Sequence, residues 1–559
     1  NKDSDIYDVL IFARRDINNP IIPSFITKIG QYSFEKCKKI IQIEFCEDSM
    51  LQVIEKCAFT HSSIEFISIP SEVTKIGQAA FYDCVNLKRV DVPFDSKLEK
   101  IEWSAFSFTA IEKVLIPSNL IEICDYVFRC CIKFTQIQFM NDSKLQTIGN
   151  HAFIHSALES IVIPSSVTNI CHDSFSNCDN LQKVEIPNDS KLKVIESFSS
   201  SKITSISIPP HIIEIKSNAF ALCRKLQQIE IPSNSELRKI GHSAFCDTSI
   251  ESIFIPSKVN ELEYGWCCGT MKLHNIEIMK NNERYKVYDN KFILGKSTPE
   301  NDVYDELLFA SRDIENVNIP SFVKRICPFA FEKCSLLKSV QIPEDSQLEI
   351  IDECSFAISS IEVINIPANV IEIGANAFSC CMNLSIVEIP NDSRIEKIGK
   401  GSFIFSKIKK IRIPSNITQI SAKCFDSCFH LSQVDIEKNT KIKIIGIESF
   451  YRASFKYFNL PSHVTEIQNY AFSNSQINRV NIDSNSELEK IGEEAFAYSK
   501  IKCFSLPKTC MKIENGAFSY CLDLLIFEFD ENSNCQSIDK DVFKESDNVL
   551  LMIPNKLKD

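Results

Sequence analysis

The stretch that decides the fold runs Ile163-Pro-Ser-Ser-Val-Thr-Asn-Ile170, continues through Asp173-Ser-Phe175, Cys178 and Leu181, and closes on Val184-Glu-Ile186-Pro187. The same pattern recurs along the 559-residue chain, and its marker Phe returns in steps that alternate mainly between 25 and 22 residues. The marker residues are Phe34, Phe59, Phe81, Phe106, Phe128, Phe153, Phe175, Phe198, Phe220, Phe245, Phe331, Phe356, Phe378, Phe403, Phe425, Phe450, Phe472, Phe496, Phe518 and Phe543. Two coils make one period of about 47 residues, which indicates a repeat architecture.

Each repeat predicts one strand and one turn. The segment that ends a unit alternates apolar and polar residues with period 2, as in a half-buried strand. The Pro that follows cannot donate to a strand ladder and ends the strand. The stretch around the marker Phe, often Gly-x-x-Ala-Phe, is too short for a full helix. We expect a helical or 3₁₀ turn there, with the Phe pointing inward as the main core residue.

Stacking must stabilise these coils, because a coil of 22 residues cannot bury its apolar face alone. The sequence therefore predicts a leucine-rich repeat solenoid of α+β type, with parallel strands on one face and short helical or 3₁₀ turns. We count 21 coils, of which 20 carry the marker Phe and one carries Trp266 in a near-equivalent place. At about 4.8 Å between strands, the coils would form a curved rod on the order of 100 Å long.

A second level of repetition divides the chain. Val303–Ile314 matches Ile6–Ile17 at a constant offset of 297 residues. The coil series is interrupted before this point by a predicted β-hairpin, in which Lys291–Leu294 leads out, a Ser-Thr-Pro-Glu-Asn turn follows and Val303–Ala310 returns. Only the returning strand has a counterpart at the N-terminus, which predicts a chain cut inside a hairpin, with more repeats upstream. The expected segments are 1–17 (truncated hairpin strand or cap), 18–280 (first solenoid segment), 281–314 (hairpin) and 315–559 (second solenoid segment).

The repeat resembles a known family. Its pattern, Ile-Pro-Ser-x-Val-x-x-Ile-Gly-x-x-Ala-Phe-x-x-Cys-x-x-Leu-x-x-Val-x-Ile-Pro, is similar to the leucine-rich repeats of the BspA-like surface antigens. This is the Treponema-type subclass of bacteria and of parasitic protists such as trichomonads. The resemblance covers essentially the whole chain. It implies a surface adhesin that binds host extracellular matrix proteins or mediates cell aggregation, and it supplies no family-wide binding residue.

Nine of the 24 Cys occupy one column, three residues after the marker Phe of every second coil. They are Cys37, Cys84, Cys131, Cys178, Cys223, Cys334, Cys381, Cys428 and Cys521. Successive members lie two coils apart, about 10 Å, whereas a disulfide needs Cα atoms within roughly 7 Å. We expect small buried thiols at the Asn/Cys ladder position of leucine-rich repeats. The vicinal pairs, such as Cys130-Cys131, lack a partner at zinc-finger spacing, so no metal site is predicted.

Composition excludes several classes of function. A net charge of −12 disfavours nucleic acid as a partner, because binding a phosphate backbone needs a basic surface. Apolar runs are too short for a transmembrane helix, and the chain opens on Asn1-Lys2-Asp3-Ser4 without a secretory signal. Many unpaired thiols are unusual in a secreted protein, yet five Asn-x-Ser/Thr sequons fit export. They begin at Asn141, Asn188, Asn383, Asn391 and Asn416.

Catalytic motifs are missing from the sequence. Gly295-Lys296-Ser297 resembles the end of a P-loop, but Asn290 stands where that motif requires Gly. There is no Gly-x-Ser-x-Gly elbow, no His-Glu-x-x-His, no dinucleotide fingerprint and no EF-hand loop. The nine His stand at positions that do not repeat. We therefore expect no enzyme, no catalytic residue and no cofactor.

One column of each strand is expected to face outward, between two inward apolar residues. It carries an acid on most of the Cys-type coils, and apolar residues on three of the alternate coils in the first half. The candidate partner-binding residues are Glu44, Asp91, Leu115, Val162, Glu185, Glu230, Phe254, Glu277, Glu388, Asp435 and Glu528. One interpretation is that the alternation merely keeps like charges off adjacent strands. The other is a surface for an extended or basic protein, with carboxylates that steer it and apolar residues that anchor it.

These features together predict a non-catalytic module that binds another protein of unknown identity. The favoured role is a surface adhesin or antigen that is secreted or displayed on the cell. The alternative is a cytoplasmic scaffold, for example one bound lengthwise to a cytoskeletal polymer, for which the unpaired thiols and the missing signal argue. Neither the ligand nor the oligomeric state follows from the sequence.

Overall fold

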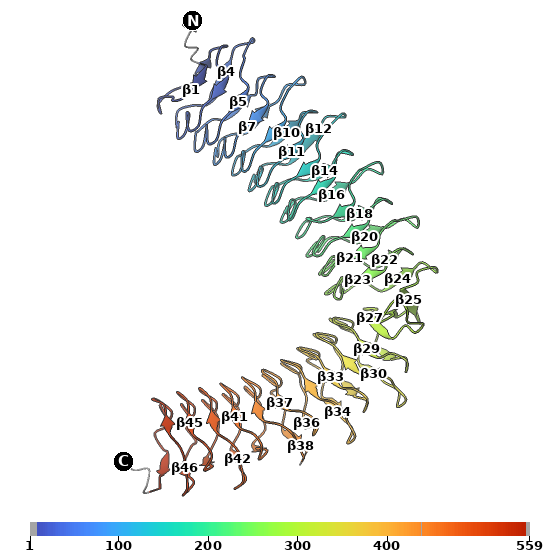
Figure 1. Ribbon diagram of the computed structural model, residues 1–559, viewed down its shortest axis with the longest axis vertical. Helices are drawn as coiled ribbons and strands as arrows, with labels where there is room; N and C mark the ends of the chain where they lie inside the picture. Colours follow the sequence, from blue (N-terminus) through green and yellow to red (C-terminus); the bar gives the residue numbers. More distant parts are fainter. Residues whose placement is uncertain (1–7, 438, 555–559) are drawn as a thin grey trace. The chain divides into compact units, whose positions relative to one another are not determined.

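The computed structural model describes residues 8–437 and 439–554, which form two compact units, Asn1–Glu283 and Arg284–Asp559 (Figure 1). Each unit is a β-solenoid in which every coil contributes two strands. A long strand, of three or four residues in every coil except that of β2, ends near the Ile-Pro, and a short strand of two residues ends at the Ile of the Val-x-x-Ile motif. The sequence predicted only the long strand, because two residues carry too little periodicity to be recognised.

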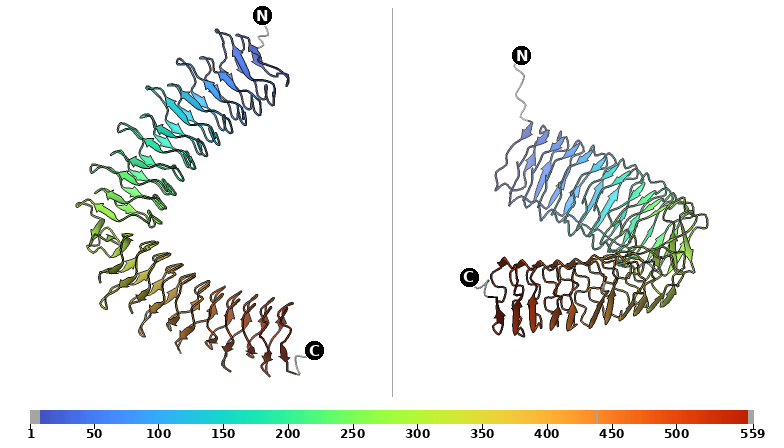
Figure 2. Two further views of the ribbon diagram at one scale, coloured as in Figure 1. Left: turned by 180° about the vertical axis from the view of Figure 1, so that it is seen from behind. Right: turned by 60° about the horizontal axis from the view of Figure 1, so that its bottom comes forward.

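Parallel pairing of equivalent residues builds two rows of strands in each unit, here called ladders, and each ladder is divided into two or three hydrogen-bonded sheets in the described residues (Figure 2). In the first unit the short-strand ladder consists of β1 (Val9–Leu10), β3 (Lys28–Ile29), β5 (Val53–Ile54), β7 (Lys75–Ile76), β9 (Lys100–Ile101), β11 (Glu122–Ile123), β13 (Thr147–Ile148), β15 (Asn169–Ile170), β17 (Val194–Ile195), β19 (Glu214–Ile215), β21 (Lys239–Ile240) and β23 (Glu261–Leu262). Its long-strand ladder consists of β2 (Ile21–Ile22), β4 (Gln42–Phe45), β6 (Phe66–Ser68), β8 (Arg89–Asp91), β10 (Lys113–Ile116), β12 (Gln136–Phe139), β14 (Ser160–Val162), β16 (Lys183–Glu185), β18 (Ser205–Ser207), β20 (Gln228–Glu230), β22 (Ser252–Ile255) and β24 (Asn275–Ile278).

The second unit repeats this arrangement after a hairpin. Its short-strand ladder consists of β29 (Arg325–Ile326), β31 (Ile350–Ile351), β33 (Glu372–Ile373), β35 (Lys397–Ile398), β37 (Gln419–Ile420), β39 (Ile444–Ile445), β41 (Glu466–Ile467), β43 (Lys490–Ile491), β45 (Lys512–Ile513) and β47 (Ser537–Ile538). Its long-strand ladder consists of β28 (Asn316–Asn318), β30 (Ser339–Gln341), β32 (Val363–Asn365), β34 (Ile386–Glu388), β36 (Lys410–Ile413), β38 (Gln433–Ile436), β40 (Tyr457–Asn459), β42 (Arg479–Asn481), β44 (Cys503–Leu506), β46 (Ile526–Phe529) and β48 (Leu550–Met552).

An antiparallel segment opens the second unit. Strand β25 (Tyr285–Tyr288) pairs with β26 (Phe292–Gly295), and β26 pairs with β27 (Glu306–Ala310). Strand β27 then pairs in parallel with β29, so it also serves as the first rung of the short-strand ladder. The start of the other copy of this stretch, at Ile6, lies outside the described residues, but β1 pairs with β3 in the same register at an offset of 297.

The marker Phe sits in a run of overlapping β-turns. The N–H of Ala152 donates to Gly149 O at 3.3 Å, and that of Ser156 donates to Phe153 O at 3.0 Å. His151, the third residue of the first turn, has a φ of 54°, as type II turns require. Alternate N–H groups donate to the next coil, as that of Phe153 does to Ser174 O at 2.8 Å. These turns replace the predicted helical or 3₁₀ turns, and the described residues contain no helix.

The core is a column of stacked rings, as the repeat predicted. Phe153 lies 5.3 Å from Phe128 and 5.0 Å from Phe175, centroid to centroid, with nearly parallel planes. The same stacking joins Phe34 to its neighbours at one end of the first unit and Phe518 to its neighbours in the second. The marker rings that stack in this way are almost wholly buried. Each coil therefore takes most of its apolar contact from the coils before and after it.

Candidate functional site

All eleven residues chosen from the sequence lie on the outward side of the long-strand ladders, here called the long-strand face. In β14, β16 and β34 the chosen residue is exposed and follows a buried apolar residue, as the period-2 pattern predicted. Register places the acids beside residues from neighbouring strands: Ile21 with Glu44, Ser68 with Asp91, Val162 with Glu185, Ser207 with Glu230, Phe254 with Glu277, Asn365 with Glu388 and Ser505 with Glu528.

Several acids of this column have a polar partner two residues earlier on the same strand. The guanidinium of Arg89 lies 2.7 Å from the carboxylate of Asp91, and Lys183 lies 3.6 Å from Glu185. The hydrogen bond with Asp91 raises the pKa of Arg89. Because residues two apart in a strand share a face, the acidic column is partly neutralised where that position is basic. This neighbouring column of polar and basic residues was not predicted from the sequence.

The long-strand face of the first unit contains a groove of about 490 Å³. Leu115 and Val162, both chosen from the sequence, line it together with Gln138, Phe139 and other residues of β10, β12 and β14. Val162 is 52% exposed, so the groove offers apolar surface to a partner.

The repeat departs from its usual sequence at one coil that lines this groove. Most coils have Ile-Pro at the end of the long strand, but here the sequence is Phe139-Met140. Unlike Pro, Met140 keeps its N–H, which donates to Ile116 O at 3.2 Å. Strand β12 therefore pairs with β10 over four residues, up to Phe139. The same hydrogen bond recurs at Met279, Glu437 and Asp530, so the missing Pro by itself does not predict the groove.

The corresponding face of the second unit is charged. A groove of about 470 Å³ is lined by Asn365, Glu388, Lys410, Arg412 and Asp435, among others. Arg412 stands 297 residues after Leu115 and forms an ion pair with Glu437 at 3.1 Å. The two units thus present different chemistry at equivalent positions, apolar in the first and zwitterionic in the second.

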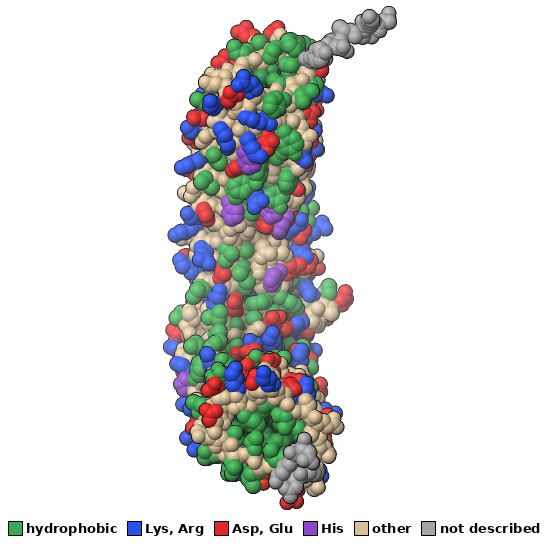
Figure 3. All heavy atoms as spheres, turned by 90° about the vertical axis from the view of Figure 1, so that its left-hand side faces the viewer, with side chains coloured by type: hydrophobic (Ala, Val, Ile, Leu, Met, Phe, Trp, Pro, Cys, Tyr) green, Lys and Arg blue, Asp and Glu red, His purple; other side chains and the backbone are tan. Residues whose placement is uncertain are grey.

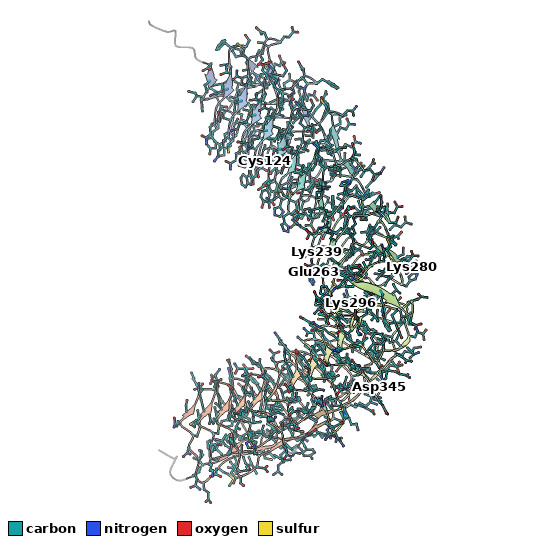
Figure 4. The ribbon with its side chains drawn as sticks, turned by 45° about the vertical axis from the view of Figure 1, so that its right-hand side comes forward. Cys124, Lys239, Glu263, Lys280, Lys296 and Asp345 are labelled. Atoms are coloured by element: carbon teal, nitrogen blue, oxygen red, sulfur yellow. The ribbon has the colours of Figure 1, made fainter. Side chains whose placement is uncertain are left out.

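The short-strand face carries ion pairs between coils. Lys239 lies 2.9 Å from Glu261 and 2.5 Å from Glu263, and Figure 4 shows Lys239 beside Glu263. These hydrogen bonds raise the pKa of Lys239. In the second unit Lys490 similarly bridges Glu466 and Glu514. The charges on this face form ion pairs between neighbouring coils. Each pair contributes at most about 0.2–1 kcal/mol to the free energy of unfolding.

The thiols of the Cys column are buried, as predicted, and they contact the backbone of the preceding coil. The Sγ of Cys178 lies 3.1 Å from Phe153 O and 3.5 Å from the hydroxyl of Ser156, both one coil earlier. Burial raises the pKa of this thiol to about 12. The same two contacts recur at Cys84, Cys131, Cys223, Cys381, Cys428 and Cys521. Since the thiolate is the nucleophile and metal ligand, these groups are poorly suited to either role.

The first thiol of the column has a different partner in each unit. Cys37 and Cys334, the first members in the two units, are approached by Arg15 and Arg312 in place of a Ser or Thr hydroxyl. Arg312 Nη1 donates to Ala330 O at 3.1 Å, and Arg15 Nη1 to Ser33 O at 3.1 Å. Both arginines thus cover the first turn of a solenoid segment with the same contact.

Aromatic and histidine rings meet on the turn side of the first unit. Tyr126 stacks on His151 at 4.9 Å, and His151 meets His172 edge to face at 5.9 Å. Trp103, 46% exposed, contacts Tyr126 at 5.9 Å. Figure 3 shows histidine side chains on one face of this unit. This cluster was not predicted from the sequence, because its members are 21 to 25 residues apart and the histidine positions do not repeat.

Within residues 8–437 and 439–554, no group of three or more His, Cys, Asp or Glu side chains is placed to hold a metal ion. The same part of the chain contains no helix long and apolar enough to cross a membrane.

The fold defines the class of protein, a parallel β-solenoid of the leucine-rich repeat type. A family model described as the BspA type leucine rich repeat region (6 copies) matches residues 8–135, 99–197, 194–292, 304–432 and 418–550. The chain therefore belongs to the BspA-type leucine-rich repeat family. Proteins with these repeats commonly serve as protein-interaction modules and are typically non-enzymatic.

The chain is also similar to several solved structures, at low identity and with TM-scores below 0.5. A leucine-rich repeat protein from Bacteroides ovatus is 21% identical, with 77% of this chain and 94% of that chain covered and a TM-score of 0.43. A leucine rich cell surface protein from Faecalibacterium prausnitzii is 19% identical, with 88% and 87% covered and a TM-score of 0.31. The pneumococcal vaccine antigen PcpA is 17% identical, with 90% and 85% covered and a TM-score of 0.30. The comparison with curated proteins finds no match.

Proposed function

We propose that this chain is a non-catalytic module that binds an extended or basic protein on its long-strand face, as a surface adhesin or antigen. The observation that carries the proposal is the groove at Leu115 and Val162, which lies on the same face as the acidic column. An apolar groove can anchor a partner, while nearby carboxylates attract basic residues over longer distances.

The contrast between the two faces supports this choice. On the short-strand face, Lys and Glu of adjacent coils neutralise one another. On the long-strand face, Glu230 is in register with Ser207, and Glu277 with Phe254. Carboxylates beside uncharged neighbours keep their charge for a partner, and Val162 leaves apolar surface exposed between them.

Charge reversal tests the proposal. The triple variant Glu185→Lys, Glu230→Lys and Glu277→Lys should lose at least tenfold in affinity for extracellular matrix proteins, and the loss should shrink as ionic strength rises. The matched control is Glu122→Lys, Glu214→Lys and Glu261→Lys, which makes the same change in net charge on the short-strand face. Equal losses in both variants, or unchanged binding in the first, would contradict the proposal.

Cell-surface display requires its own experiment. Intact cells that produce the protein should be labelled with a membrane-impermeant amine reagent, with lysed cells and a cytoplasmic protein as controls. Labelling of this chain in intact cells supports the adhesin. Labelling only after lysis supports the scaffold, bound for example along a cytoskeletal polymer, in which the unpaired thiols would remain in a reducing compartment.

A further inference from the structure

Two cysteines outside the thiol column occupy the same repeat position on neighbouring coils. Cys510 stands two residues before strand β45, and Cys535 stands two residues before β47. These two strands pair in parallel, with Lys512 in register with Ser537. The register therefore places Cys535 directly beside Cys510, one coil further along the solenoid.

Backbone hydrogen bonds hold this part of the two coils together. The residues on either side of Cys535 both donate an N–H group to the preceding coil. That of Asn534 donates to Lys508 O at 3.0 Å, and that of Gln536 donates to Met511 O at 2.9 Å. The Cα atoms of the two cysteines are therefore separated by the spacing of neighbouring strands, about 4.8 Å. A disulfide bond joins Cα atoms that lie about 4.4–6.8 Å apart, so this separation is suitable.

The two thiols also point the same way. The Sγ of Cys510 lies 3.7 Å from Lys512 O, and the Sγ of Cys535 lies 3.8 Å from Ser537 O, the equivalent carbonyl of its own coil. Cys510 is buried and Cys535 is half-buried. Burial, with a smaller contribution from Cys535, raises the pKa of the Cys510 thiol to about 12. This electrostatic effect requires the two sulfur atoms to be close to each other.

The pair departs from the repeat at a core position. From β3 to β23 and from β29 to β43, the residue two places before each short strand is Ile, Leu or Val, and it is buried. Leu488, on the coil before Cys510, is an example. Cys510 and Cys535 replace this aliphatic residue on two consecutive coils. Because a smaller side chain in a core costs stability, packing does not account for the two replacements, whereas a bond between them does.

We propose that Cys510 and Cys535 form a disulfide bond in the folded protein under oxidising conditions. The two residues are 25 positions apart, so the bond would close a ring around a single coil. It would restrict the separation of that coil from the next one when the solenoid opens locally. The inference concerns core side chains and is independent of the partner that we propose for the long-strand face.

Oxidised glutathione is a suitable small disulfide to drive the reaction. The thiolate of Cys535 attacks it, which releases one glutathione and leaves a mixed disulfide on Cys535. The thiolate of Cys510 then attacks the Sγ of Cys535, and the second glutathione leaves. The two protons and two electrons that the protein loses convert one glutathione disulfide into two thiols. Because burial raises the pKa of both cysteines, the reaction should become faster as pH rises.

Disulfide mapping tests the proposal. The folded full chain is treated with oxidised glutathione, unfolded in N-ethylmaleimide, digested with trypsin and analysed by mass spectrometry. Trypsin leaves Cys510 in the peptide 509–512 and Cys535 in the peptide 513–540. We expect most chains to contain a disulfide between these two peptides. Because Cys521 lies in the second peptide as well, two variants identify the partner. Cys535→Ser should reduce the amount of linked peptide at least tenfold, and Cys521→Ser should leave it unchanged.

Hydrogen exchange gives a second measurement. Oxidation should slow the exchange of amides in residues 511–534 at least tenfold, and dithiothreitol should restore the original rates. The Cys510→Val variant, which copies the aliphatic residue of the other coils, is the matched control. It should fold with an unchanged melting temperature, and its exchange should not respond to oxidation.

Two outcomes would overturn the proposal. One is glutathione that stays on Cys535 of the folded chain without any link to Cys510, since the second thiol would then be unable to reach the first. The other is a link that Cys510 forms with Cys521 as often as with Cys535, or forms only in unfolded protein. In that case the register of the two coils would not select the pair.

Discussion

The Sγ of Cys178 lies 3.1 Å from the carbonyl oxygen of Phe153, so a core thiol bonds the backbone of one coil to the next. The Phe153 carbonyl oxygen accepts one hydrogen bond within its own coil, from the turn N–H of Ser156, and the thiol of Cys178 provides a second. The thiols of this column therefore have a structural role, and the stability of the solenoid depends on their staying protonated.

Alkaline pH should destabilise the protein through these thiols. Burial raises the pKa of Cys84, Cys178 and Cys428 to about 12, against an ordinary value of 9.0. The folded state thus holds protons that the unfolded state releases, so the free energy of unfolding falls as pH rises from about 9 towards 12. Thermal unfolding should show a steeper loss between pH 8.5 and 10.5 than in the Cys84→Ala, Cys178→Ala, Cys428→Ala variant. Parallel curves for the two proteins would refute the assignment.

The marker rings should carry much of the stability. Replacing Phe153 by Ala removes a buried ring between two others and should cost about 3–5 kcal/mol of unfolding free energy. Because coils contact mainly their neighbours, hydrogen exchange should accelerate near residues 128–175 and remain unchanged in distant coils. Phe94, 83% exposed, is the control, and Phe94→Ala should change stability by less than about 0.5 kcal/mol. A uniform acceleration along the unit would contradict nearest-neighbour stabilisation.

A methyl group at Gly149 should be costly. A Cβ built there would lie 2.5 Å from the carbonyl carbon of Cys124 and 2.6 Å from the nitrogen of Asp125, and the backbone of the adjacent coil cannot move aside freely. We expect Gly149→Ala to lose about 1–3 kcal/mol in urea unfolding. Cys124→Ala, at the same repeat position one coil earlier, is the matched control and should lose less. Equal effects would mean that the coils can separate at little cost.

The groove of the first unit should distinguish the two units in binding. Leu115→Arg copies the residue that the second unit has at Arg412, and it should weaken the partner at least tenfold if the apolar groove anchors it. Leu115 is half-exposed, so circular dichroism and the melting temperature should change little. Arg412→Leu is the reciprocal variant, tested by surface plasmon resonance. If Leu115→Arg retains its affinity, the groove does not anchor the partner, and the contact must lie elsewhere on the long-strand face.

Much of this architecture was predictable because one period governs it. The outward column, the inward Phe and the spacing of Cys178 from its column neighbours all follow from counting residues. The turns could not be predicted in the same way. Non-glycine residues such as His151 adopt a positive φ there, and the residue type does not indicate this conformation. The groove was not predicted, because the repeat pattern does not show how much of Val162 stays exposed. The cluster of Tyr126 with His151 depends on which coils are adjacent.

The alternation of thiol and hydroxyl coils also constrains how such a chain can change its length. Cys178 approaches Ser156, and no two members of the column occupy adjacent coils. Deleting a single hydroxyl coil would set two thiols about 5 Å apart, inside the range in which a disulfide can form. Deleting two adjacent coils preserves the alternation of thiol and hydroxyl coils. Under oxidising conditions, gains and losses of whole pairs of coils would be tolerated, whereas the loss of one hydroxyl coil or the gain of one thiol coil would introduce a site for covalent crosslinking.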